Sequence, residues 1–152
     1  MPRPLLIGVG MPFAGDDEAG RLVAERLAAH DQPFDIAETQ GIAADLVLLF
    51  EDRARVLIVD ACQSGAPPGT IHRIDATGGA LPPYLGSVSS HGIGAGEAIR
   101  LAEALGLLPR RCDLWAIEGT DFTLGAPLSR TVAEAVEICV REIPDLLRAG
   151  GD

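Results

Sequence analysis

The sequence predicts an α/β fold, a three-layer α/β/α sandwich with a mostly parallel central sheet of about five strands. Short apolar runs alternate along the chain with segments whose apolar residues recur at helical spacing. The strongest strand signal is residues 55–61 (RVLIVDA), a run of aliphatic side chains that ends near an aspartate. Because strands and helices alternate within one short chain, we expect a parallel sheet covered by helices on both faces.

Five strands and four helices are expected in chain order. The strands are residues 5–10, 34–38, 55–61, 70–75 and 112–117. The helices are residues 16–29, 42–51, 94–105 and a last helix that opens near Ser129. Gly106 is the expected stop of the third helix, and Thr131 with Glu134 forms a candidate capping box for the last one. Residues 78–86, rich in glycine and proline, are expected to form a loop.

Length and composition fit one folded domain that spans residues 1–152. Apolar residues make up 47% of the chain, which is enough for a core. Aromatic residues make up only 4%, so aliphatic side chains have to build that core. No internal repeat, low-complexity segment or linker divides the sequence, and a single domain is therefore expected.

Charge and hydropathy bear on partners and location. The net charge of −10 argues against non-specific binding to nucleic acid or anionic membranes, since both favour clustered lysine and arginine. No apolar run reaches the roughly 18 residues of a membrane span, and the N-terminus lacks a signal pattern. Cys62, Cys112 and Cys139 are far apart and form no CxxC motif, which predicts reduced, mostly buried thiols. A cytoplasmic protein is expected.

Residues 8–20 (GVGMPFAGDDEAG) place two adjacent carboxylates, Asp16 and Asp17, where the first strand gives way to the first helix. Ligands of open parallel sheets bind beyond the carboxyl ends of the strands. Asp17 lies just past the first strand, Asp60 ends the third, and His91 stands in a loop directly before a helix. The topology therefore directs two carboxylates and an imidazole towards one crevice.

Each of these residues also has a structural interpretation. Asp17 could serve only to complement the helix dipole, and His91 could be an exposed loop residue. Asp60 favours a functional interpretation, because a carboxylate that ends an aliphatic strand is poorly hydrated and needs a cation or donors nearby. His30 and His72 receive no role, since they fall at a helix end and at an alternating strand position.

Common nucleotide-binding and hydrolase motifs are absent. Gly8 and Gly10 are followed by a glycine only at Gly15, too far for a dinucleotide fingerprint, and no phosphate-loop GK[ST] occurs. The GxSxG elbow of serine hydrolases is missing too. Cys62 lies two residues after Asp60, so a cysteine nucleophile stays open, although a small buried hydrophobe is the favoured interpretation.

The set of Asp17, Asp60 and His91 has the chemistry of a metal site. Two carboxylate oxygens and one imidazole nitrogen suit a borderline divalent ion such as zinc or nickel, and they leave coordination positions open. The set does not follow the HExxH motif, so spacing alone does not establish three ligands.

Four segments in order resemble the nickel–iron hydrogenase maturation proteases. They are GVGMPFAGDDEAG near the N-terminus, VDACQSGAPPGT in the middle, SSHGIG after it, and LS before the last helix. The resemblance covers essentially the whole chain, with the motifs in the order that the family has them. One segment alone would be weak, but the ordered set is specific.

This resemblance implies an aspartyl-type endopeptidase of the cytoplasm with an α/β/α fold. Such proteases remove a short C-terminal extension from the hydrogenase large-subunit precursor once nickel has been inserted. Carried over by position, the metal-contacting residues of the family fall on Asp17, Asp60 and His91, which would also be the catalytic cluster. No permanent cofactor is implied: the substrate contributes the nickel, and zinc or cadmium could occupy the site in vitro. A monomer that docks on the large-subunit precursor is expected.

Two departures from the family's usual pattern leave alternatives open. Met11 stands where the family usually has asparagine, and Glu18 where it usually has glycine. A non-catalytic nickel-checkpoint protein that binds the large subunit is therefore a second hypothesis, and a metallo-aminopeptidase-like enzyme with its own zinc is a third. Glu118, at the end of the last strand, also falls at the carboxyl edge and is a candidate to line the cleft.

Overall fold

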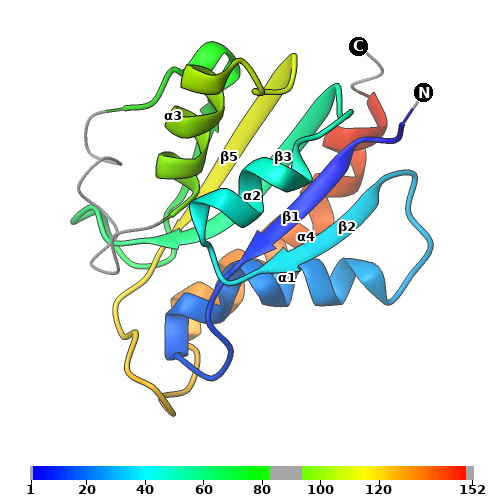
Figure 1. Cartoon of the computed structure of the whole chain (residues 1–152). Coiled ribbons are helices and arrows are strands. Elements are labelled where there is room, and N and C mark those ends of the chain that lie inside the picture. Colours follow the sequence, from blue (N-terminus) through cyan, green and yellow to red (C-terminus); the bar gives the residue numbers. More distant parts are fainter. Residues whose placement is uncertain (1, 83–93, 150–152) are drawn as a thin grey trace.

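A computed structural model describes residues 2–82 and 94–149, whose strands form one five-stranded sheet in the order β2-β1-β3-β5-β4 (Figure 1). The strands are β1 (Leu5–Val9), β2 (Asp35–Thr39), β3 (Arg55–Cys62), β4 (Ile71–Asp75) and β5 (Arg111–Glu118). The helices are α1 (Ala19–Ala28), α2 (Ala43–Leu49), α3 (Ala95–Leu105) and α4 (Arg130–Ala149), with 3-10 turns η1 (Gly15–Glu18) and η2 (Thr77–Gly79). Within the described residues, no helix has both the length and the apolar character needed to span a bilayer.

The predicted three-layer arrangement is confirmed. Helices α1 and α4 pack on one face of the sheet, and α2 and α3 pack on the other (Figure 1). Successive side chains of a strand point to opposite faces, so the aliphatic run of β3 supplies both cores. Val56 and Ile58 pack on the side of α2 and α3, whereas Leu57 and Val59 pack on the side of α1 and α4.

Four strands run parallel, as expected, but the edge strand β4 runs antiparallel to β5. Only residues 63–70 connect β3 to β4, and a connection this short does not allow the crossover that a parallel strand requires. The first residues of β4 therefore lie beside the last residues of β5, with Ile71 opposite Ile117 and His72 opposite Ala116. The start of β4 is thus brought to the carboxyl edge of the sheet.

The structure corrects two local predictions. The first expected helix begins as the 3-10 turn η1 and becomes α-helical only at Ala19. The capping box predicted at Thr131 and Glu134 is wrong, because α4 begins at Arg130 and Thr131 already lies inside the helix. By contrast, Gly106 ends α3 in the left-handed conformation (φ 71°), as predicted.

Glycine at position 20 allows α1 to pack directly on the backbone of the sheet. A Cβ at Gly20 would overlap the carbonyl oxygens of Val9 and Val59, one from each of the two central strands. Gly10 has a similar role at the end of β1, where a Cβ would overlap the carbonyl oxygen of Asp17. The backbone of η1 is therefore held against the carboxyl edge by contacts that no larger residue permits.

Replacing Gly20 by alanine tests this close approach, because helix propensity predicts a gain in stability and packing predicts a loss. Glycine-to-alanine substitution inside a helix ordinarily stabilises it by up to about 1 kcal/mol. We expect Gly20→Ala instead to destabilise the protein by about 1–3 kcal/mol, the cost of overpacking against rigid backbone. Thermal denaturation measures the difference, with Glu25→Ala at an exposed position of the same helix as the control. A higher melting temperature for Gly20→Ala would contradict the packing described here.

Candidate functional site

The two adjacent carboxylates at the end of β1 have different surroundings. Asp16 is completely buried and accepts hydrogen bonds from the Ser129 amide (2.7 Å), the Ser129 hydroxyl (2.7 Å), and the amides of Thr120 (2.8 Å) and Asp121 (3.1 Å). Burial by itself raises the pKa of Asp16, but these hydrogen bonds outweigh it and leave the pKa below its usual value. Asp16 therefore joins η1 to residues 119–129, the connection between β5 and α4.

Asp17 lies in the same turn and is only partly buried. Its Oδ2 accepts a hydrogen bond from the Met11 amide at 3.2 Å, and the neighbouring Glu18 Oε2 accepts one from the Phe13 amide at 3.3 Å. The two carboxylates thus fix the loop between β1 and η1. Glu18, which stands where the family usually has glycine, therefore makes a structural contact of its own with the Phe13 amide.

Asp60 lies at the carboxyl end of β3 and is partly buried, as the sequence predicts. Its Oδ1 accepts a hydrogen bond from the Ala61 amide (2.8 Å) and its Oδ2 a long one from the Ala95 amide (3.4 Å) at the start of α3. Desolvation, with a smaller contribution from the negative charge of Asp17, raises the pKa of Asp60 to about 7 against the lowering effect of its two backbone hydrogen bonds. The contribution from Asp17 requires the two carboxylates to be near one another at this edge.

The third predicted member of the site, His91, lies outside the described residues, so its place beside Asp17 and Asp60 stays a prediction. His91 belongs to the segment that joins η2 to α3. The described chain resumes at residue 94, shortly after His91. α3 then begins at Ala95, whose amide donates a hydrogen bond to Asp60.

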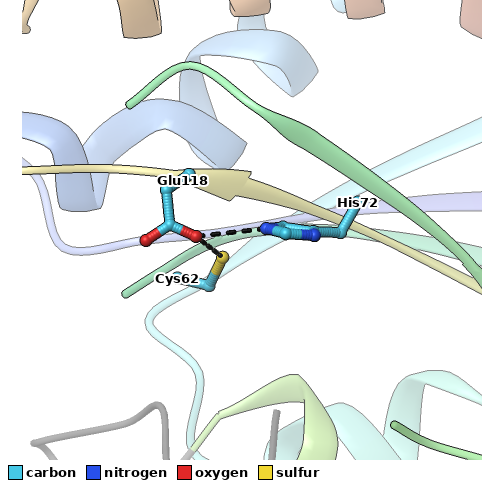
Figure 2. Close-up of side chains that lie close together, drawn as sticks. All are labelled: Cys62, His72 and Glu118. Atoms are coloured by element: carbon cyan, nitrogen blue, oxygen red, sulfur yellow. Dashed lines mark hydrogen bonds and ion pairs between the residues drawn. The ribbon is translucent and has the colours of Figure 1, made fainter. Parts of the chain in front are cut away.

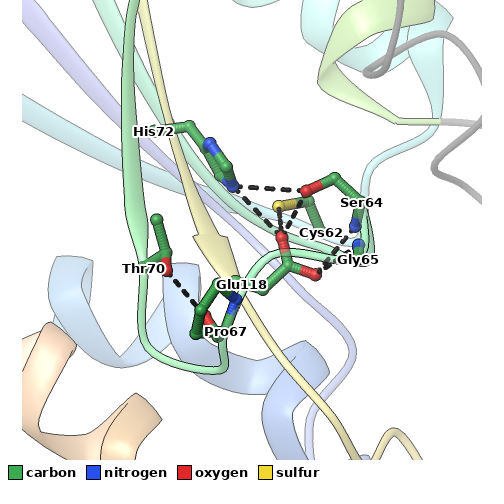
Figure 3. Close-up of polar contacts among 7 residues, drawn as sticks. All are labelled: Cys62, Ser64, Gly65, Pro67, Thr70, His72 and Glu118. Carbon is green, nitrogen blue, oxygen red and sulfur yellow. Dashed lines mark hydrogen bonds and ion pairs between the residues drawn. The ribbon is translucent and has the colours of Figure 1, made fainter.

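A second polar cluster, not foreseen as a unit, lies further along the carboxyl edge. Figure 2 shows Cys62 from β3, His72 from β4 and Glu118 from β5 with their side chains converging. Glu118 Oε1 lies 3.4 Å from Cys62 Sγ and 3.1 Å from His72 Nε2. Figure 3 adds Ser64, whose hydroxyl donates to the same Oε1 at 2.6 Å. Burial raises the pKa of Glu118, but the hydrogen bonds from Ser64, His72 and Cys62 leave it below its usual value.

This cluster is not a serine- or cysteine-protease centre. Ser64 Oγ (3.4 Å) and Glu118 Oε1 approach the same ring nitrogen of His72, Nε2, whereas a catalytic triad uses both ring nitrogens. Cys62 is buried, and desolvation followed by the nearby Glu118 raises the pKa of its thiol. A buried, protonated thiol is a poor nucleophile, which agrees with the favoured interpretation of Cys62 as a buried residue.

The sequence predicts the position of Glu118 in this cluster, but not that of His72. Glu118 ends a buried strand just as Asp60 does, and it was placed at the same edge on that ground. His72 receives no role from the sequence, because it falls at an alternating strand position. Only the reversed direction of β4 brings its imidazole to Glu118.

Apolar side chains border the carboxyl edge on the side of Asp17. Phe13 is 75% exposed, Leu124 is 76% exposed and Met11 is 41% exposed. The loops that carry them are joined, since the Gly125 amide donates to the Phe13 carbonyl oxygen at 2.6 Å. Phe13 also adopts a left-handed backbone (φ 64°), which is strained for a residue with a side chain. We call Met11, Phe13 and Leu124 the apolar rim.

A family model described as hydrogenase maturation protease matches residues 21–145. The chain belongs to the hydrogenase maturation protease family. The family expected from the sequence motifs is therefore confirmed, and with it the peptidase class of its relatives.

Two curated relatives are a hydrogenase expression/formation protein and a hydrogenase maturation protease. The chain is 34% identical over 116 residues to the hydrogenase expression/formation protein HoxM of Cupriavidus necator, covering 74% of this chain and 55% of that protein. It is 42% identical over 74 residues to the hydrogenase 3 maturation protease of Escherichia coli, covering 47% of each. The chain thus spans about half the length of these curated relatives.

Solved structures of maturation proteases share the fold. The hydrogenase maturating endopeptidase HybD from Escherichia coli superposes with a TM-score of 0.78 at 20% identity, covering 98% of this chain and 94% of that one. The hydrogenase 3 maturation protease superposes with a TM-score of 0.74 at 24% identity, covering 95% and 90%. The likeness extends over the whole described sheet and its two helical layers.

The different surroundings of Asp16 and Asp17 predict different losses of stability when each is replaced by asparagine. We expect Asp16→Asn to lower the free energy of unfolding by about 2–4 kcal/mol, because the amide presents a donor where four donors already converge. Asp17→Asn, at a partly buried position, weakens the hydrogen bond from the Met11 amide and should cost about 1 kcal/mol or less. Urea denaturation of both variants near pH 7, with the exposed Asp31→Asn as control, measures the difference. Equal costs for the two aspartates would refute their assignment to different roles.

The raised pKa of Asp60 predicts a pH-dependent penalty. The folded protein holds the Asp60 proton up to about pH 7, whereas the unfolded chain releases it near pH 3.8. Stability therefore falls as the pH rises between these values and stays reduced above pH 7. We expect Asp60→Asn to melt above the wild type at pH 8, with a gap that shrinks towards pH 4; each 1 kcal/mol corresponds to about 2–4 °C. A gap that does not change with pH would mean that Asp60 has an ordinary pKa.

Proposed function

We propose that this protein is an endopeptidase that removes the C-terminal extension of a nickel–iron hydrogenase large-subunit precursor after nickel insertion. Asp17, Asp60 and His91 would contact the nickel that the substrate carries. The observation that carries the proposal is the approach of Asp17 to Asp60 at the carboxyl edge, in a chain of the maturation-protease family. The proposed setting is the cytoplasm, with the protein acting as a monomer.

The electrostatics of the two carboxylates support recognition of a cation. Two neighbouring carboxylates repel each other when both are charged, and this repulsion contributes to the raised pKa of Asp60. A divalent ion placed between them would remove the repulsion and favour the charged form of both. The energy gained depends on the ion being present, so the site is suited to distinguish a nickel-loaded partner from an empty one.

The proposed chemistry is hydrolysis of one peptide bond. Docking would place the scissile carbonyl near the nickel of the substrate, and the ion or a carboxylate would activate a water for attack. A carboxyl group with a pKa near 7 can exchange a proton with water at neutral pH, which suits Asp60 for general acid–base work. No permanent cofactor is required, although zinc or cadmium could occupy the same ligands in vitro.

The apolar rim supports a protein as the substrate. Met11, Phe13 and Leu124 expose apolar surface beside Asp17, where a partner has to dock for its metal to reach the carboxylates. Exposed aromatic and aliphatic side chains at a cleft are typical of protein–protein contacts. Phe13 combines a strained backbone with a solvent-exposed ring.

The deciding experiment is incubation with nickel-loaded and nickel-free large-subunit precursor, read by mass. We expect cleavage of the loaded form alone, and a loss of at least about 100-fold in rate for Asp17→Asn, since catalytic proton transfer and charge stabilisation each contribute about that much. The exposed Asp31→Asn serves as the matched control and should cleave normally.

The other outcomes identify the competing functions. Cleavage of both precursor forms would keep the protease and remove the nickel dependence. Binding without cleavage of either form would favour the checkpoint protein, the alternative that Met11 and Glu18 raise. Normal cleavage by both Asp17→Asn and Asp60→Asn would refute the site itself.

A further inference from the structure

We propose that Cys62, His72 and Glu118 form a second metal site, specific for a zinc-like divalent transition-metal ion and separate from the set of Asp17, Asp60 and His91 (Figure 2). The three residues come from three different strands, β3, β4 and β5, at the same carboxyl edge. The proposal rests on their geometry and donor chemistry and holds whether or not the protein cleaves a hydrogenase precursor.

The distances suit a tetrahedral ion. Glu118 Oε1 lies 3.4 Å from Cys62 Sγ and 3.1 Å from His72 Nε2, and all three atoms lie within 4.8 Å of one another. Zinc binds sulfur at about 2.3 Å and nitrogen or oxygen at about 2.0–2.2 Å, which separates tetrahedral ligands by about 3.3–3.7 Å. The two distances from Glu118 are already close to these values, and the remaining separation, between the thiol and the imidazole, would have to close by up to about 1 Å on binding.

The donor set also selects the ion. A thiolate, an imidazole and a carboxylate favour zinc or a similar transition metal over magnesium and calcium, which prefer oxygen ligands throughout. Binding releases the thiol proton of Cys62, while His72 binds through Nε2 and keeps its proton on Nδ1. A divalent ion with one thiolate and one carboxylate is neutral overall, as a buried site requires.

Without an ion, more hydrogen-bond donors approach Glu118 Oε1 than this oxygen can accept well. Three potential donors approach Glu118 Oε1: Cys62 Sγ, His72 Nε2 and Ser64 Oγ. One carboxylate oxygen offers about two lone pairs, so three donors cannot all bond well. When an ion binds between the three residues, Cys62 and His72 become ligands of the ion. They then no longer compete with Ser64 to donate hydrogen bonds to Oε1.

The surrounding backbone holds the ligands in place. Cys62 and Glu118 are direct partners in the β3–β5 ladder, so their Cα positions are fixed by the sheet. The other oxygen of Glu118, Oε2, accepts hydrogen bonds from the amides of Ser64 (2.7 Å) and Gly65 (3.3 Å), which turns Oε1 towards Cys62 and His72 (Figure 3). Such outer contacts orient metal ligands and raise affinity. Ser64 Oγ or a water would supply the fourth ligand.

Cobalt(II) provides the test, because a thiolate bound to cobalt gives a charge-transfer absorption that oxygen and nitrogen ligands do not. The reduced, metal-stripped full-length protein is titrated with Co²⁺. We expect one equivalent with a thiolate band, no band in Cys62→Ser, and an apparent affinity at least about tenfold lower in His72→Asn and Glu118→Gln. Cys139→Ser, which removes a buried thiol on the far face of the sheet, and Asp60→Asn should both keep the band.

Three results would overturn the proposal: no thiolate band in the wild type, a band that survives in Cys62→Ser, or a band lost equally in Asp60→Asn. In each case the cluster would serve only to hold residues 63–70 against Glu118 by hydrogen bonds. Circular dichroism checks the fold of each variant. If Cys62→Ser does not fold, the partly exposed His72→Asn decides, since an unchanged cobalt affinity there excludes the site.

Discussion

The buried carboxylate of Asp16 is the interaction on which the candidate site depends. It accepts four hydrogen bonds from residues 120–129 and so joins the turn after β1 to the connection between β5 and α4. These segments are more than 100 residues apart in sequence. Because the charge is buried, each of these donors is needed to offset its desolvation. The turn that carries Asp17 is thereby held rigidly at the carboxyl edge.

Rigidity at this point gives the neighbouring carboxylates their chemistry. The charge of Asp17 raises the pKa of Asp60, so the two carboxylates influence each other at this edge. Gly10 and Gly20 contribute to the same constraint, since they let η1 and α1 approach the strand backbone without an intervening side chain. A cation brought by a partner would thus meet ligands that are already in position, which lowers the cost of ordering them.

The carboxyl edge holds two polar clusters with different character. The first joins Asp17 and Asp60 beside the apolar rim and is partly exposed, as a surface that meets a partner has to be. The second joins Cys62, His72 and Glu118 and is almost closed to solvent. Both lie on neighbouring strands, so a change in one can reach the other through β3, which carries Asp60 and Cys62 two residues apart on the same side.

The sequence by itself determined the layers, the aliphatic cores, the family and the place of Asp60, because these follow from local periodicity and from contiguous motifs. It selected Asp17 for the site but gave no role to Asp16, because only donors from residues 120–129 show that Asp16 is buried and hydrogen-bonded. It also missed the role of His72, since the direction of an edge strand depends on how the whole sheet assembles. Tertiary structure decided these points because each depends on contacts between residues far apart in the chain, which no spacing along the sequence records.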